Sequence, residues 1–198
     1  MRLNNFNIRN TFRSRDLTNK KILICGYGRI GKKVADICKF FNMSVFVYDK
    51  YLDLDNDKNN FKLINNLDES MDIFDFITLH IPYNNSGKPL IDENFLSKLK
   101  KNCSIINTSR GDLINENDLT NHLDKNKDFY AGLDVFDPEP PNKDSKILKF
   151  KNVVLTPHSA AYTEECLSKM SMYCAENINN FFDNNPNISL LINKEIYS

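Results

Sequence analysis

The 198-residue sequence has no net charge, because 26 basic residues balance 26 acidic ones. The two signs are interspersed and form no basic stripe, so electrostatics gives no support for binding to nucleic acid or to an anionic membrane. No apolar run approaches the length that spans a bilayer, and the first residues contain no apolar signal-peptide segment. The sequence therefore predicts a cytoplasmic protein that acts on small molecules.

Paired cysteine motifs are also missing. The cysteines are odd in number, lack C-x-x-C spacing and lie mostly in apolar segments, which predicts buried thiols. They are Cys25, Cys38, Cys103, Cys166 and Cys174. The acidic loop 52–60 lacks the glycine and the terminal glutamate of an EF-hand, so it does not indicate a calcium site. No metal is expected.

Length and composition allow one substantial core. A hydrophobic content of 41% over 198 residues suffices for one domain and leaves no room for two full-sized ones. We expect a polar lead-in over residues 1–20, a dinucleotide-binding domain over 21–185 and a tail over 186–198.

The stretch from Lys21 to Asp49 is typical of a dinucleotide-binding unit. The apolar run 22–25 predicts a buried strand, which leads into the spacing G-x-G-x-x-G at Gly26, Gly28 and Gly31. Apolar residues at helical spacing follow, so the free N–H groups of a helix N-terminus would face the glycines and bind a phosphate. A pyrophosphate site is therefore expected at this turn.

A carboxylate ends the next strand. Asp49 follows the apolar run 45–48, about twenty residues after the glycines, where it can accept hydrogen bonds from the hydroxyls of an adenosine ribose. The carboxylate would repel the 2′-phosphate of NADP, although Lys50 beside it would attract that phosphate. The expected cofactor is NAD.

The rest of the chain continues the alternation of strands and helices. Further strands are expected at 61–64, 74–81, 103–107, 130–135 and 153–155, and helices at 67–72, 92–101, 116–126 and 163–182. This pattern predicts an α/β fold with a doubly wound parallel sheet of the Rossmann type, whose ligands bind beyond the carboxyl ends of the strands. The polar candidates at those ends are His80, Thr108, Ser109, Arg110, Asp134 and His158.

Four blocks of sequence resemble the D-isomer-specific 2-hydroxyacid dehydrogenases, in particular those like phosphoglycerate dehydrogenase. The blocks are RSRDLTNKKILICGYGRIG, LHIPYNNSGKPLIDENFLSKLKKNCSIINTSRGDLIN, AGLDVFDPEP and NVVLTPHSAAYTEE. They occur in family order over most of the chain, which makes the match far more specific than the glycine motif alone. The resemblance implies a hydride transfer between NAD(H) and a 2-hydroxy or 2-oxo acid.

The same resemblance implies roles for three catalytic residues. Arg110 would hold the carboxylate and carbonyl oxygen of a 2-oxo acid, a task suited to a planar cation with several donors. His158 would protonate the carbonyl oxygen as the hydride arrives, and would act as the base in the reverse direction. Glu139 would hydrogen-bond the other imidazole nitrogen and keep that proton available. In isolation, Arg110 and Glu139 could form a surface ion pair, but their motifs favour the catalytic interpretation.

Other residues are implied to contact the cofactor. Asp134 would orient the nicotinamide, although a carboxylate at a strand end could also cap a turn. The remaining cofactor-binding candidates are Arg29, Ile30, His80, Thr108 and Ser109, together with Arg110 and His158. A histidine after a strand is often structural, and this alternative stays open for His80.

The family places its active site between this domain and a substrate domain built largely from earlier residues. Since the chain starts at Met1 just before the glycine turn, we expect the N-terminal half of the substrate domain to be absent. Two functions follow: an oxidoreductase whose missing half comes from a second chain, or a non-catalytic NAD-binding module. A formate dehydrogenase, which would carry Gln in place of Glu139, and a corepressor of similar fold are weaker alternatives. The resemblance also implies a homodimer.

Overall fold

The computed structural model describes residues 14–52, 61–68, 71–82, 87–193 and 195. Contacts within the chain divide it into two compact units, Met1–Pro157 and His158–Ser198, and each is described by itself. The predicted end of the dinucleotide-binding domain at residue 185 lies inside the second unit, and the predicted domain limits stay a prediction. Residues 1–13 of the predicted lead-in and 53–60 of the acidic loop lie outside the described residues.

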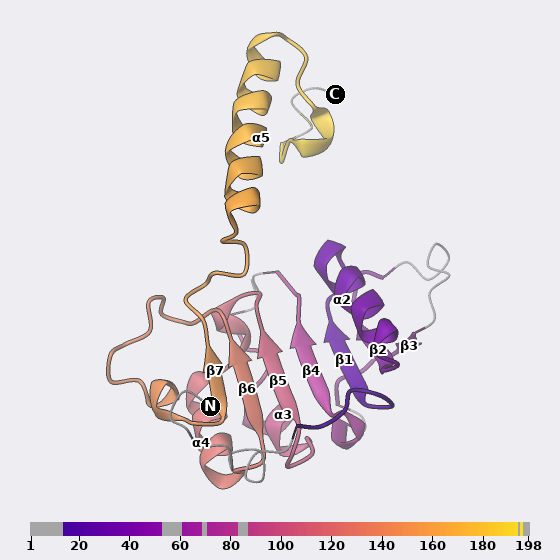
Figure 1. The fold of residues 1–198 in the computed structure, drawn as a ribbon, viewed down its shortest axis with the longest axis vertical. Coiled ribbons are helices and arrows are strands. Elements are labelled where there is room, and N and C mark those ends of the chain that lie inside the picture. Colours follow the sequence, from indigo (N-terminus) through magenta and orange to yellow (C-terminus); the bar gives the residue numbers. More distant parts are fainter. Residues whose placement is uncertain (1–13, 53–60, 69–70, 83–86, 194, 196–198) are drawn as a thin grey trace, which may run out of the picture. The chain divides into compact units, whose positions relative to one another are not determined.

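A parallel sheet forms the first unit (Figure 1). Its strands are β1 (Lys21–Cys25), β2 (Ser44–Tyr48), β3 (Lys62–Leu63), β4 (Phe76–Leu79), β5 (Ser104–Asn107), β6 (Tyr130–Leu133) and β7 (Val153–Leu155). The order across the sheet is β3-β2-β1-β4-β5-β6-β7, and every neighbouring pair is parallel. The chain builds outward from β1 in one direction and then from β4 in the other. This confirms the doubly wound parallel fold and puts all the carboxyl ends of the strands at one edge.

In the described residues of the first unit, the helices are α2 (Arg29–Phe40), α3 (Glu93–Ser97) and α4 (Glu116–Lys125). Asp92 caps α3 by accepting a hydrogen bond from the N–H of Phe95, and Asn115 caps α4 in the same way. Short 3-10 turns occupy Met71–Ile73, Gly111–Leu113 and Lys146–Lys149. The first overlaps only the end of the helix predicted at 67–72, whose residues 67–68 form a turn and whose residues 69–70 lie outside the described residues. The helix α3 is shorter than predicted because i→i−3 hydrogen bonds tighten the chain after Ser97.

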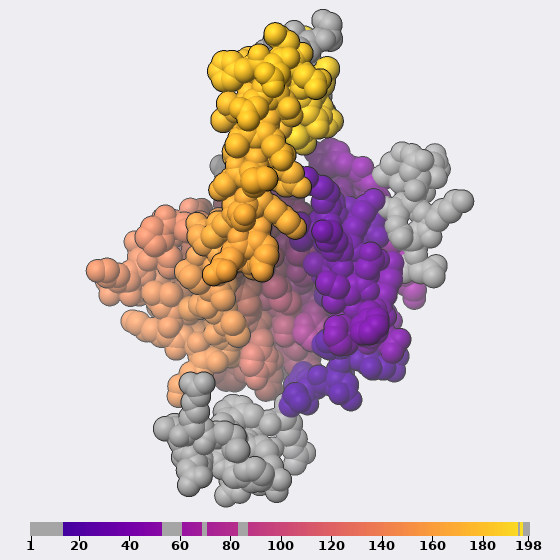
Figure 2. Space-filling view, turned by 45° about the horizontal axis from the view of Figure 1, so that its top comes forward, coloured from indigo at the N-terminus to yellow at the C-terminus, as the bar shows by residue number. Residues whose placement is uncertain are grey.

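The two faces of the sheet carry separate apolar clusters. In β1, Ile22 and Ile24 belong to one cluster, whereas Leu23 and Cys25 belong to the other, as the two-residue period of a strand requires. The first cluster also contains Ala35 and Cys38 of α2, and the second contains the buried apolar residues of α3 and α4. Helices therefore cover both faces. The side of α2 that faces away from the sheet lies at the surface of the molecule, in the indigo to purple region of Figure 2.

The second unit contains α5 (Glu164–Phe182) and a 3-10 turn at Ile188–Leu190. The helix begins where the sequence predicts, because the hydroxyl of Thr163 accepts a hydrogen bond from the N–H of Cys166 at 3.1 Å. None of the residues of α5 is buried. Within the described part of the chain, a search for helices with the length and hydropathy of a membrane span finds none.

The five thiols fall into two groups. Cys25, Cys38 and Cys103 are buried as predicted, but the prediction is wrong for the half-exposed Cys166 and the exposed Cys174. Their apolar spacing is real, yet it lies on α5, which buries no side chain. Burial raises the pKa of both Cys25 and Cys103 to about 12, so these thiols stay protonated at neutral pH.

This difference predicts the order in which the thiols react. In the native protein, a disulfide reagent at neutral pH is expected to modify Cys174 and Cys166 quickly, and Cys25 and Cys103 only after the sheet unfolds, because the thiolate is the reactive form. Peptide mass mapping over a time course measures each site separately. Rapid native-state labelling of Cys25 would contradict the burial of β1.

Candidate functional site

The glycine turn after β1 is packed too closely for other residues at two of its three glycines. Gly26 has a φ of +94°, and a Cβ on it would lie 2.5 Å from the carbonyl oxygen of His80. A Cβ on Gly31 would lie 2.0 Å from the carbonyl oxygen of Gly26. The ends of β1 and β4 and the first turn of α2 therefore meet here with no room for side chains.

Gly28 differs from its two neighbours in the motif. A Cβ on Gly28 would meet nothing within 4 Å, and its φ of −75° is open to any residue. Neither packing nor backbone conformation of the described chain explains a glycine at this position. An open approach to the backbone does explain it, and a pyrophosphate requires that approach.

The N-terminus of α2 lies at the same place. Gly28 is its N-cap, no side chain caps the helix among the described residues, and its first turn contains no acidic residue. The first N–H groups of a helix carry partial positive charge and seek an acceptor. Arg29 and Ile30 in this first turn are both exposed. The residues present thus fit the phosphate groups of a dinucleotide.

The carboxylate of Asp49 is held beside this turn. Its Oδ2 accepts a hydrogen bond from the N–H of Tyr27 at 2.7 Å, and its Oδ1 accepts one from the N–H of Tyr51 at 2.8 Å. These two donors fix the side chain at the carboxyl end of β2, next to the second residue of the glycine turn. An acceptor held at this position suits the hydroxyls of a ribose.

The loops that follow β4 and β5 are tied together. The N–H of His80 donates to the carbonyl of Cys25 at 2.7 Å, and the hydroxyl of Ser109 donates to the carbonyl of Ile81. The imidazole Nε2 of His80 lies 3.0 Å from the hydroxyl of Thr78, and burial lowers the pKa of His80. These contacts are structural, and contact of His80 with the cofactor stays a prediction.

Asn107, which the sequence analysis missed, organises the turn that presents Arg110. Asn107 is buried; its side-chain Oδ1 accepts from the N–H of Ser109 at 3.1 Å, and its Nδ2 donates to the carbonyl of Arg110 at 2.7 Å. The guanidinium of Arg110 is exposed and donates to the carbonyl of Ser109 at 2.7 Å. The only signal in the sequence is an amide residue at the end of an apolar strand, three positions before the arginine.

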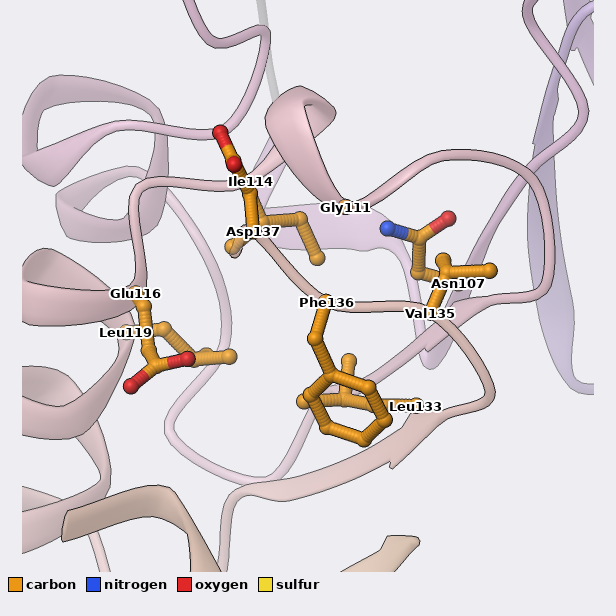
Figure 3. Close-up of a pocket in the computed structure, with 9 residues that line it drawn as sticks. All are labelled: Asn107, Gly111, Ile114, Glu116, Leu119, Leu133, Val135, Phe136 and Asp137. Atoms are coloured by element: carbon orange, nitrogen blue, oxygen red, sulfur yellow. The ribbon is translucent and has the colours of Figure 1, made fainter. Parts of the chain in front are cut away.

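A small cavity lies beneath this turn (Figure 3). Its volume is about 20 Å³, and it is lined by Asn107, Gly111, Ile114, Glu116, Leu119, Leu133, Val135, Phe136 and Asp137. This volume holds about one water molecule and excludes a nucleotide. The close fit has a cause, because a Cβ on Gly111 would lie 2.0 Å from the carbonyl group of Phe136. The Arg110 turn is thus packed from below.

Asp134 is a buried carboxylate at the end of β6. Only 3% of its surface is exposed, and its N–H donates to the carbonyl of Asn107 at 2.9 Å. The hydroxyl of Thr156 donates to its Oδ1 at 2.5 Å. Asp134 therefore lies at the same edge of the sheet as the glycine turn and the Arg110 turn.

The other two catalytic candidates belong to different units. Glu139 is exposed in the segment that follows β6, whereas His158 is the first residue of the second unit. His158 has a φ of +51°, in the left-handed region that is uncommon for residues other than glycine. The hydrogen bond between Glu139 and His158 stays a prediction, as do the roles of all the site residues.

A family model for the NAD-binding domain of D-isomer specific 2-hydroxyacid dehydrogenases matches residues 1–160. The chain belongs to this family. The predicted family is thereby confirmed, and so is NAD as the cofactor, because the matching model is that of the family's NAD-binding domain.

Individual members of the 2-hydroxyacid dehydrogenase family show the same similarity. The chain is 36% identical over 171 residues to a D-3-phosphoglycerate dehydrogenase of Methanocaldococcus jannaschii. This match covers 86% of this chain and 32% of that protein. It is 33% identical over 183 residues to a glyoxylate reductase of Aeropyrum pernix, covering 91% and 54% respectively. The chain thus spans from about a third to about half of the length of these relatives.

Solved structures of the family agree with the fold. The NAD-complexed D-isomer specific 2-hydroxyacid dehydrogenase of Lactobacillus delbrueckii ssp. bulgaricus matches with a TM-score of 0.77 at 27% identity, over 88% of this chain and 56% of that one. A D-2-hydroxyisocaproate dehydrogenase matches with a TM-score of 0.81 at 25% identity, over 91% and 58%.

Proposed function

We propose that this chain is the NAD-binding part of an oxidoreductase that transfers a hydride between NAD(H) and a D-2-hydroxy or 2-oxo acid. The observation that carries the proposal is the exposed Arg110 on a turn that Asn107 holds at the cofactor edge of the sheet. A guanidinium fixed there can bind a carboxylate with two parallel hydrogen bonds. A substrate acid would then lie beside the nicotinamide end of the cofactor.

The residues would share the chemistry as follows. NADH, when bound, supplies the hydride to the carbonyl carbon. Arg110 binds the substrate carboxylate and polarises the carbonyl, His158 gives a proton to the carbonyl oxygen, and Glu139 orients the imidazole. Arg29, Ile30, Thr108 and Ser109 line the cofactor, with Gly26, Gly28, Gly31 and Asp49 around its phosphates and adenosine. Since His158 accepts the proton in the reverse direction, the same group serves oxidation.

The test is consumption of NADH with glyoxylate, hydroxypyruvate, pyruvate and 3-phosphohydroxypyruvate. The substitution His158→Gln is expected to lower kcat by about a thousandfold, the scale of a lost general acid, while KM and NADH affinity change little. His122, on α4, gives a matched control, and His122→Gln should leave turnover unchanged. Full activity of His158→Gln would remove the proton donor from the proposal.

The alternative function is a non-catalytic NAD-binding module, which is supported by the matching family model because that model describes the NAD-binding domain alone. Binding of NADH without turnover of any of the four acids, even after addition of a separately expressed substrate domain, would select this function and reject the first. The hydride-transfer proposal predicts turnover at least in that mixture.

We also propose a homodimer in the cytoplasm. For the compartment, the support is that all five cysteines are free thiols, which suits a reducing environment.

For the homodimer, the support comes from the outer side of α2, which exposes Ile37 (57%) and Phe40 (83%). Exposed apolar side chains of this size support a contact between copies. Light scattering on the purified chain measures its mass in solution, and a monomer at all concentrations would reject the dimer.

A further inference from the structure

The two ends of a dinucleotide lie over different halves of this sheet. The glycine turn and Asp49 follow β1 and β2, so the phosphates and the adenosine belong to the half that begins at β1. A dinucleotide crosses the point where the strand order reverses, which lies between β1 and β4. The nicotinamide end therefore lies over the half that contains β4, β5 and β6.

Asp134 is the buried carboxylate of this second half. It follows β6 directly and is 3% exposed, so its removal from water must be compensated by hydrogen bonds. The carboxamide of nicotinamide carries an NH2 group, and a carboxylate oxygen is its strongest acceptor. A carboxylate serves this purpose well only if its orientation is fixed before the cofactor arrives.

Thr156 supplies that orientation from the neighbouring strand. It comes directly after β7, its N–H donates to the carbonyl of Leu133 at 3.0 Å, and its hydroxyl donates to Oδ1 of Asp134 at 2.5 Å. Through these two hydrogen bonds, Thr156 joins the end of β7 to the end of β6. Thr156 is itself exposed, so its hydroxyl is not needed to fill the core.

We infer that Thr156 is a positioning residue for the nicotinamide end of the cofactor, because its hydroxyl holds the Asp134 carboxylate in place to accept the carboxamide N–H. Asp134 touches the cofactor, and Thr156 acts through Asp134. This inference rests on the proposed function, since it assigns NAD to this edge of the sheet. Thr156 is also separated only by Pro157 from the proposed proton donor His158, so the residue that holds Asp134 is two positions from the residue that handles the proton.

The experiment compares two ligands that differ only at this end. NADH carries the nicotinamide, whereas ADP-ribose shares the adenosine, pyrophosphate and second ribose but lacks the ring. Both are titrated calorimetrically into the 198-residue chain and into Thr156→Val, which keeps the branched shape and the backbone N–H but removes the hydroxyl. Thr156→Ser restores the hydroxyl, and Val154→Ala changes an exposed residue of the adjoining strand β7 whose side chain cannot form a hydrogen bond.

The expected result is a selective loss. Thr156→Val should weaken NADH binding about fivefold, the scale of one net hydrogen bond, and leave ADP-ribose affinity unchanged. Thr156→Ser and Val154→Ala should bind both ligands as the unchanged chain does. If Thr156→Val weakened the affinity for NADH and for ADP-ribose equally, Thr156 would have a general structural role and the inference would fail. Unchanged NADH affinity in Thr156→Val, or weakened NADH affinity in Thr156→Ser, would also overturn it.

The unchanged chain separates this inference from the proposed function. If it binds NADH more tightly than ADP-ribose, the ring is engaged and the variants decide the role of Thr156. If it binds both equally, the cofactor assignment stands but the nicotinamide end has no partner, and the inference fails alone. If it binds neither, the proposed function fails and the inference falls with it.

Discussion

The substitution Gly28→Asp is expected to abolish NADH binding, with a loss of at least about a hundredfold, while the free energy of unfolding stays the same or rises by a few tenths of a kcal/mol. Nothing in the described chain lies within 4 Å of a Cβ at this position, so the first carbon of the new side chain meets no steric conflict. Asp is a preferred N-cap residue, and its carboxylate would accept from the first N–H groups of α2.

The same carboxylate would exclude the cofactor. It would occupy the N–H groups that the pyrophosphate needs. It would also place a negative charge beside the two negative charges of the pyrophosphate. Two lost charge-assisted hydrogen bonds cost about 3 kcal/mol together, which is about a hundredfold in affinity. Calorimetric titration with NADH and urea unfolding of the same preparation measure the two quantities.

Gly31→Ala is the matched control, because the opposite result is expected. A Cβ on Gly31 would lie 2.0 Å from the carbonyl oxygen of Gly26, so α2 must move away from β1. Overpacking of this kind costs about 3 kcal/mol, at the upper end of its usual range, since a backbone atom and not a flexible side chain must yield. If Gly28→Asp destabilised the chain as much as Gly31→Ala, or still bound NADH, then Gly28 would not be an opening for phosphate.

The sequence predicts the strands well because each one is an apolar run that polar or glycine residues interrupt. Each of the seven strands in the sheet begins and ends within two residues of its predicted limits, and β7 has the predicted limits at both ends. The glycine spacing and Asp49 were predictable because their partners are local: Asp49 accepts from the N–H of Tyr27, inside the same strand–helix–strand unit. A signal contained in about thirty consecutive residues can be interpreted without a structure.

The contacts that organise the rest of the site join distant segments. Thr156 and Asp134 are 22 residues apart and meet only because β6 and β7 are neighbours. Asn107 resembles any polar residue at the end of a strand. Its burial becomes visible only in the structure, where the N–H of Asp134 donates to its carbonyl and Phe136 lines the same cavity. The apolar spacing of α5 failed to predict burial for Cys166 and Cys174, because periodicity identifies a face without identifying what covers it.

The second large effect concerns the turn that presents Arg110. The substitution Asn107→Asp is expected to lower the free energy of unfolding by about 3 kcal/mol at neutral pH, since a buried ionised carboxylate would replace the amide. The new side chain would keep an acceptor for the N–H of Ser109, but it would set a second acceptor against the carbonyl of Arg110, which Nδ2 of Asn107 now contacts at 2.7 Å.

The sign of the pH dependence distinguishes this cause from a simple loss of packing. A protonated carboxyl group regains an O–H donor for the carbonyl of Arg110, and burial beside that carbonyl raises the pKa of the new carboxyl group in the folded state above its unfolded value of about 4. The destabilisation relative to the unchanged chain is therefore largest above the raised folded pKa, shrinks as the pH falls through it, and is smallest below about 4. Asn107→Ala loses both hydrogen bonds and gains no titratable group, so its destabilisation should not depend on pH. Urea unfolding of the three proteins at neutral and acidic pH measures this difference. If the two variants lost the same stability at every pH, the Nδ2 bond to Arg110 would not be what holds the turn.

If the Nδ2 bond does hold the turn, both variants should also lose turnover of 2-oxo acids more severely than NADH affinity, because Arg110 binds the substrate and not the dinucleotide phosphates.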